Sequence, residues 1–119
     1  MKKYLIIILL FAISCNDEKD ILIGNTCGVD RPLEELDWLK DEISEINDSD
    51  VKRYLYLTQA NYQNQTVFIF GNCCPFCLTI TSVMDCGGEF IGILGTDIDN
   101  SEITDEQVIW TPEGFECQL

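Results

Sequence analysis

Residues 66–80 read TVFIFGNCCPFCLTI, and this stretch contains the features that decide the fold. Its first half is a run of β-branched and aromatic residues, which is typical of a buried strand. The run leads directly into Cys73, Cys74 and Cys77, and the last two of these form a C-x-x-C sequence. Such a cluster has three interpretations: a thiol–disulfide active site, half of a metal site, or disulfide staples in a small exported domain.

The first fifteen residues, MKKYLIIILLFAISC, resemble a bacterial lipoprotein signal. Two lysines precede an apolar core, from Tyr4 to Ile13, that is too short to span a bilayer as a mature helix. The resemblance implies cleavage before Cys15 and lipidation of that cysteine, so we expect residues 1–14 to be removed. The alternatives are an ordinary secretory signal and a membrane-anchoring helix.

Residues 15–29 are expected to form the lipidated cysteine and an acidic tether. The run NDEKD after Cys15 resembles the surface-export signal of Bacteroidota-type lipoproteins, and it would also serve as a solvated linker. No other stretch approaches the ~18 apolar residues that a transmembrane helix needs. The sequence therefore predicts a protein that a lipid anchors to the outer membrane, facing the cell surface.

The charge balance and the absence of histidine exclude several classes of function. Without the two N-terminal lysines the chain has 5 basic and 21 acidic side chains, so it repels phosphate backbones and is not expected to bind nucleic acid. The chain contains no histidine, which removes Ser-His-Asp and Cys-His catalysis and every zinc site that uses histidine. Carboxylates are abundant, but no pair of them stands out as a catalytic acid and base.

An even number of cysteines in a small exported domain is typical of a disulfide framework. A chain of this size can fold on its hydrophobic core alone. We therefore expect each bridge to add ~2–4 kcal/mol to the free energy of unfolding that the core provides. The six candidates for disulfide bonds are Cys27, Cys73, Cys74, Cys77, Cys86 and Cys117.

Strand geometry limits how these cysteines can pair. If residues 78–85 form one strand that rises ~3.3 Å per residue, Cys77 and Cys86 stand roughly 30 Å apart and cannot form a bridge. Cys86 must then reach Cys27, Cys117 or the cysteine cluster. The two adjacent cysteines of the cluster are expected to take separate partners, because a ring joining them would be strained.

A helix is predicted from residue 31 to residue 46, with Asp30 as its cap and Pro32 in its first turn. Trp38 does not fit the apolar face of this helix, because at 100° per residue it points nearly opposite Leu36, among acidic residues. Either another part of the chain folds over Trp38, or this side chain is an exposed contact for a partner. The apolar face itself repeats at spacings of three and four and consists of Leu33, Leu36, Leu39, Ile43 and Ile46.

After residue 50 the hydrophobic period changes to two, which predicts strands. The joins between the predicted strands are mostly short, and this favours antiparallel neighbours, because a parallel crossover needs a dozen or more residues. We therefore expect residues 30–119 to form a single α+β domain, with one N-terminal amphipathic helix packed on an antiparallel sheet of four or five strands and stabilised by disulfides. The predicted strands are residues 51–59, 66–71, 78–85, 89–95 and 107–111.

A thioredoxin-like site at Cys74-Pro75-Phe76-Cys77 is the main alternative to a staple. Such a site needs a strand and then C-x-x-C at the N-terminus of a helix. The strand is present, but the residues after the motif are dense in β-branched side chains, and only seven residues follow Pro112, too few for the closing hairpin and helix of that fold. We therefore favour a staple.

The sequence contains incomplete ligand patterns for two kinds of metal site, one for zinc and one for calcium. A zinc site from the cysteines at 73, 74, 77 and 86 would lack a second C-x-x-C pair, and free thiolates are unexpected in an oxidising space. In the acidic loop of residues 95–107, Asp97, Asp99 and Ser101 stand at alternate positions like the first ligands of a calcium loop, but the glycine and the bidentate glutamate of that loop are missing. Weak calcium binding stays open there, and no cofactor is expected.

Four short motifs together resemble a group of small Bacteroidota-type lipoproteins of unknown function. They are CGVDRPLEELDWLK, the cysteine-rich stretch after residue 71, MDCGGEFIG and VIWTPE, and they cover residues 27–112. The resemblance implies a cellular location and a broad architecture, and it identifies no catalytic residues. We therefore expect a membrane-anchored binding or structural module that is not an enzyme and has a protein or glycan partner. The alternative is an extracytoplasmic thiol–disulfide protein.

Overall fold

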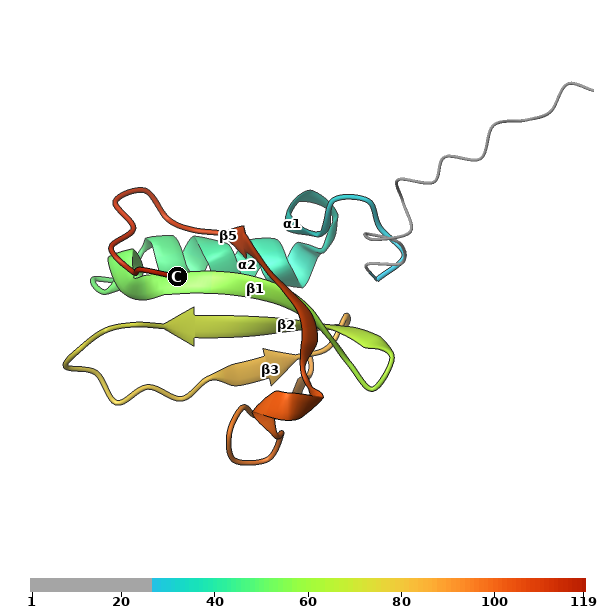
Figure 1. The fold of residues 1–119 in the computed structure, drawn as a ribbon. Helices are drawn as coiled ribbons and strands as arrows, with labels where there is room; N and C mark the ends of the chain where they lie inside the picture. The colour runs from blue at the N-terminus through green and yellow to red at the C-terminus, as the bar shows by residue number, and fades with distance from the viewer. Residues whose placement is uncertain (1–26) are drawn as a thin grey trace, which may run out of the picture.

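The computed structural model describes residues 27–119, which form an α+β fold with a five-stranded antiparallel sheet (Figure 1). The lipidation site Cys15, residues 1–14 and most of the predicted tether lie outside the described residues. Among the described residues, no helix has the length and apolar character that crossing a bilayer requires. The strands are β1 (Leu55–Tyr62), β2 (Gln65–Asn72), β3 (Ser82–Met84), β4 (Phe90–Ile93) and β5 (Thr104–Trp110), in the spatial order β4-β3-β2-β1-β5.

The β1–β2 hairpin is the longest ladder of the sheet. It pairs eight residues on each strand, from Leu55 opposite Asn72 to Tyr62 opposite Gln65. Its turn consists only of residues 63 and 64, which both have positive φ, at 49° and 61°. This is the two-residue turn whose twist matches that of a hairpin. The predicted strand at 51–59 therefore begins later and ends later, and a 3-10 turn at Lys52–Tyr54 precedes it.

The predicted strand at 78–85 is wrong in length, because only Ser82–Met84 pair with β2. Pro75 and the bridge between Cys74 and Cys77 turn the chain at the end of β2, so residues 78–81 lie outside the ladder despite their β-branched composition. The distance that excluded a bridge from Cys77 to Cys86 rested on that longer strand. The two cysteines are nevertheless in different bridges.

The single helix predicted for residues 31–46 is also wrong. The structure has α1 (Pro32–Glu35) and α2 (Asp37–Asn47), which Leu36 separates in an extended conformation, with φ −92° and ψ 106°. Asp30 is not the cap. Residue 31 holds the cap position, and its backbone N–H donates a hydrogen bond to Oε2 of Glu35 at 2.7 Å. Leu36 and Trp38 both pack against the same apolar cluster, although one continuous helix would place them nearly opposite each other.

The two faces of the sheet carry separate apolar clusters, because side chains alternate along each strand. On one face, Val67 and Ile69 of β2 pack with residues of β1, β3 and the β4–β5 connection, which crosses this face from one sheet edge to the other (Figure 1). On the other face, Leu57 and Phe68 pack with Leu39 of α2. These last three side chains are fully buried, and each such burial contributes about 1.5–3 kcal/mol.

Candidate functional site

All six cysteines after Cys15 are paired, in three disulfides. Their Cα–Cα distances are 5.3, 5.9 and 5.4 Å, within the range that a disulfide requires. The two adjacent cysteines take separate partners, as predicted, and Cys86 takes the first of its three predicted options. The bridges are Cys27–Cys86, Cys73–Cys117 and Cys74–Cys77.

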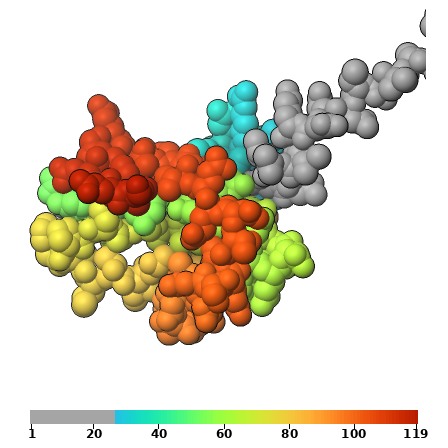
Figure 2. Space-filling model, viewed as in Figure 1, coloured from blue at the N-terminus to red at the C-terminus, as the bar shows by residue number. Residues whose placement is uncertain are grey.

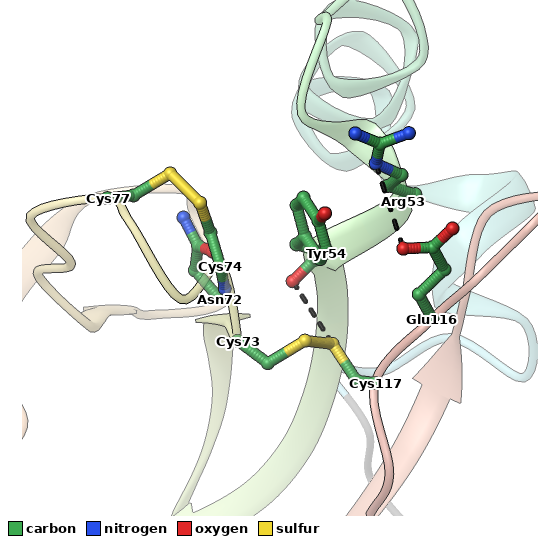
Figure 3. A network of polar contacts seen from close by, with 8 residues as sticks. All are labelled: Arg53, Tyr54, Asn72, Cys73, Cys74, Cys77, Glu116 and Cys117. Atoms are coloured by element: carbon green, nitrogen blue, oxygen red, sulfur yellow. Dashed lines mark hydrogen bonds and ion pairs between the residues drawn. A yellow bond between two sulfur atoms is a disulfide. The ribbon is translucent and has the colours of Figure 1, made fainter.

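Two of these bridges meet at the end of the sheet where β1 begins and β2 ends (Figure 3). The carbonyl oxygen of Tyr54 accepts a hydrogen bond from the backbone N–H of Cys73 at 2.9 Å. The Sγ of Cys117 lies 3.3 Å from the same oxygen, in a close contact rather than a hydrogen bond, because a disulfide sulfur carries no proton. The C-terminal segment is further held by the backbone N–H of Glu116, which donates to the carbonyl oxygen of Arg53 at 2.9 Å.

The bridge between Cys74 and Cys77 closes a tight turn from which large apolar side chains project. We call residues 74–80 the stapled loop. Phe76 is 77% exposed, Leu78 fully exposed and Ile80 65% exposed. Figure 2 shows this part of the chain, in yellow, at the end of the molecule away from the N-terminal described residues, in blue. The sequence did not predict this feature, because the β-branched composition of residues 78–80 is typical of a strand.

The stapled loop is anchored at its base. The side-chain oxygen of Asn72 accepts a hydrogen bond from the backbone N–H of Cys74 at 2.8 Å, and Cys74 itself is buried. The ring of Phe76 meets the ring of Tyr54 edge to face, with centroids 6.0 Å apart, and Arg53 lies over the same tyrosine ring at 5.0 Å. The loop is therefore held in shape while most of its apolar surface stays open to solvent.

A groove of about 270 Å³ runs beside the stapled loop, between α2 and the strands β2 and β3. We call it the apolar groove. Its walls include Ile46 of α2, Phe70 of β2, Met84 of β3 and Ile80 of the stapled loop. Glu42 of α2 also lines it and is half-buried. Among the described residues, the carboxylate of Glu42 has neither a hydrogen bond nor an ion pair.

A larger polar groove of about 830 Å³ lies at the β1–β2 turn, lined mainly by side-chain amides and carboxylates. Two of its carboxylates already bind groups of the chain. Asp85 Oδ1 accepts hydrogen bonds from the backbone N–H of Gly87 and of Glu89, both at 2.9 Å. Asp105 Oδ2 accepts one from the side-chain amide of Asn61 at 2.9 Å. None of the described residues that line it is aromatic.

Trp38 packs within the chain. Its indole Nε1 donates a hydrogen bond to the carbonyl oxygen of Cys86 at 2.8 Å, and its ring meets Phe68 edge to face, with centroids 5.7 Å apart. Gly88 lies directly under the ring. Cys27, which was expected to lie in the tether, belongs to the same cluster. The β3–β4 turn and the residues around Cys27 thus fold over Trp38, and its role as a partner contact stays a prediction.

The three calcium candidates serve the folding of their own loop. Asp97 Oδ2 accepts a hydrogen bond from the backbone N–H of Ile93, and Asp99 Oδ1 accepts one from the backbone N–H of Ser101. The backbone N–H and the hydroxyl of Ser101 together hold the pKa of Asp99 below its ordinary value of 3.8. Within residues 27–119, no three potential metal-ligating side chains of Asp, Glu, Cys or His gather in one place.

Comparison with known proteins finds neither a matching family model, nor a matching curated protein, nor a matching solved structure.

Proposed function

We propose that this chain is a lipid-anchored, surface-exposed lipoprotein that acts as a non-catalytic binding module and presents the stapled loop to a partner. The observation that carries the proposal is the exposure of Phe76, Leu78 and Ile80 within one short loop. Single apolar residues on a surface are ordinary, whereas a contiguous group of them is typical of an interaction site.

The Cys74–Cys77 bridge supports a role in presentation. It joins residues only three apart in sequence, so it restricts the unfolded chain far less than the other two bridges, which span 59 and 44 residues. Its main effect is on the shape of the folded loop. A loop that is already rigid loses little conformational entropy on binding, and this favours affinity.

The position of the loop also supports display away from the membrane. The described chain begins at Cys27, which is bonded to Cys86 in the β3–β4 turn. The stapled loop precedes β3 and this turn follows it, so the two lie at opposite ends of that strand. A lipid on Cys15 would hold the Cys27 end near the membrane, which leaves the stapled loop facing outward.

The second candidate is the thiol–disulfide protein. It is favoured by the partial exposure of Cys77 within an apolar loop, a setting in which a disulfide can meet an unfolded substrate. Against it, Cys74 is buried and the residues after Cys77 form a loop rather than a helix. The helix N-terminus that activates such a thiol is therefore missing from this part of the chain.

The proposal is tested by photo-crosslinking in intact cells of the source organism. A photoreactive amino acid replaces Leu78, and in a control chain it replaces Glu106, an exposed residue of β5. We expect a discrete protein adduct from position 78 only. Failure of position 78 to give an adduct, or the same adducts from both positions, would contradict the role of the stapled loop.

Lipid anchoring is tested separately by mass spectrometry of the protein purified from membranes. We expect a chain that begins at an acylated Cys15, and a Cys15→Ser variant that leaves the membrane fraction. A chain that retains residues 1–14, or that is cleaved elsewhere and carries no lipid, would contradict the anchor and leave the binding role of the loop to the crosslinking result.

A further inference from the structure

We infer that the partner segment is a peptide that combines a large apolar side chain with a nearby lysine or arginine. The apolar side chain enters the apolar groove beside the stapled loop, and the cation pairs with Glu42. This inference rests on the proposed function and names the ligand chemistry of the same site.

The apolar groove exists because α2 is too narrow to cover its face of the sheet. A helix about 10 Å wide covers roughly two strands that lie ~4.8 Å apart. Among the described residues, the cluster around Leu39 of α2 takes side chains from β1, β2 and β5 and none from β3 or β4. Accordingly, the exposed fraction of the side chains on this face rises from β2 to β3 to β4, along a row of residues that are paired with one another across the strands. Phe68 of β2 is fully buried, Met84 opposite it on β3 is half-buried, and Phe90 opposite Met84 on β4 is 55% exposed.

The volume of the groove suits side chains rather than a cofactor. Small-molecule sites usually enclose about 300–1,000 Å³, and this groove lies just below that range. The lining is more apolar than polar, with Ile46, Phe70, Ile80 and Met84 beside the polar residues Tyr56, Asn72 and Ser82, and this favours an apolar side chain over a sugar. The stapled loop extends the same apolar surface beyond the groove through Leu78.

The electrostatic complement of the groove is a cation. Its only acidic lining residue, Glu42, has no partner in the described part of the chain. Three of the four basic residues in residues 27–119, Arg31, Lys40 and Arg53, are already in ion pairs with other carboxylates. A partner that covered the groove with apolar surface alone would strip water from this carboxylate at a cost, whereas a partner that brings a lysine or arginine compensates it.

A peptide is favoured over a bilayer as the occupant. The hydrocarbon region of a bilayer would also desolvate Glu42 and contains no cation to pair with it, while the acidic chain as a whole is repelled by anionic lipid. The stapled loop precedes β3, and the groove runs along that strand, since Ser82 and Met84 both line it, whereas the bridge from Cys27 lies beyond the other end of β3. The polar groove at the β1–β2 turn is not favoured, because two of its carboxylates already accept hydrogen bonds from the chain.

The test is selection of peptides from a random twelve-residue display library on the purified full chain. We expect the selected peptides to be enriched in Leu, Ile, Met, Phe or Trp, with Lys or Arg within four residues. A synthetic peptide of the selected sequence should then bind roughly three- to tenfold more weakly to the Glu42→Gln variant. Glu45→Gln, an exposed position on the same helix, is the matched control and should leave the affinity unchanged.

A second variant separates the failure of this inference from the failure of the proposed function. Ile80→Ser should weaken the same peptide by about tenfold or more, because it removes apolar surface at the junction of groove and loop. Peptides that require Ile80 but bind Glu42→Gln as tightly as the natural chain would overturn the inference and leave the stapled loop as a binding surface. Absence of any selected peptide would overturn both.

The membrane alternative is an outcome of the same series. The protein for this test is the chain without residues 1–14 and without an acyl group on Cys15. After sedimentation with phosphatidylcholine vesicles, we expect this protein to stay in the supernatant. Cosedimentation that Ile80→Ser abolishes would make a bilayer the occupant and overturn the inference.

Discussion

The indole nitrogen of Trp38 donates a hydrogen bond to the carbonyl oxygen of Cys86 and so links α2 to the β3–β4 turn at 2.8 Å. Trp38→Phe retains an aromatic ring near Phe68 but leaves that carbonyl without its donor, which should lower the free energy of unfolding by about 1–2 kcal/mol. Urea unfolding measures the loss. Trp110→Phe is the control, because Trp110 packs on the same cluster without an indole hydrogen bond to another described residue. Equal losses in the two variants would contradict the structural role of this bond.

Residue 88 must be glycine for two reasons, its backbone conformation and its close contact with Trp38. Its φ is +81°, and a Cβ there would lie 2.6 Å from Cδ2 of Trp38. Gly88→Ala should therefore destabilise the fold by about 1–3 kcal/mol in urea unfolding. Gly87→Ala is the matched control in the same turn, since its φ is ordinary and a Cβ would meet only Asp85 at 3.4 Å. A Gly88→Ala variant as stable as Gly87→Ala would be inconsistent with the packing described for Trp38.

The three disulfides should differ in their contribution to stability. Restriction of the unfolded chain predicts about 4 kcal/mol for Cys27–Cys86 and for Cys73–Cys117, and about 2 kcal/mol for Cys74–Cys77. Paired serine substitutions followed by urea unfolding give the three values. We expect the Cys74→Ser/Cys77→Ser variant to be the most stable of the three and to lose affinity for the selected peptide. If it is instead the least stable, the bridge is a structural staple of the core rather than a support for the loop.

The carboxyl group of Asp99 should titrate below its ordinary value. The hydrogen bonds from the backbone N–H and the hydroxyl of Ser101 favour the ionised form and lower the pKa of Asp99 in the folded state. Its contribution to stability is therefore present above the unfolded pKa and is lost as the pH falls through the folded pKa, in the range below about pH 4. Carbon-detected NMR titration of Asp99 should give a midpoint below 3.8.

The control for this titration is Ser101→Ala, which removes the hydroxyl but keeps the backbone N–H. We expect it to move the pKa of Asp99 only part of the way back, because the backbone hydrogen bond is the larger of the two causes. A midpoint at or above 3.8 in the natural chain would show that Asp99 does not accept these bonds in solution, and it would reopen the loop to a metal ion.

The broad architecture was predictable because side chains that alternate between the two faces of a sheet leave a period of two in the sequence. Residues Val67 to Phe70 alternate between the two apolar clusters, and this period of two predicted β2 correctly. The same signal failed after Cys77. A β-branched run is compatible with a strand, but Pro75 and the Cys74–Cys77 bridge turn the chain away before the run begins, and pairing rather than composition decides a strand.

The candidate site was only partly predictable, because it depends on which apolar side chains the fold leaves exposed. That Cys73 and Cys74 have different partners followed from the strain of a ring between neighbours, and this prediction is confirmed. The apolar groove depends on how α2 crosses the sheet, which no local pattern encodes. For Trp38, the sequence left two alternatives open, and the structure shows the one in which another part of the chain, here the β3–β4 turn, folds over the side chain.

The central claim is that the cysteines after Cys15 are a framework that holds a binding loop, and not a redox centre. Non-reducing peptide mapping of the exported protein, with graded reduction, tests it most directly. The account predicts the bridges 27–86, 73–117 and 74–77, all of which resist a potential in the glutathione range. Selective opening of the 74–77 bridge at a mild potential, or free thiols that hold a metal ion, would contradict it.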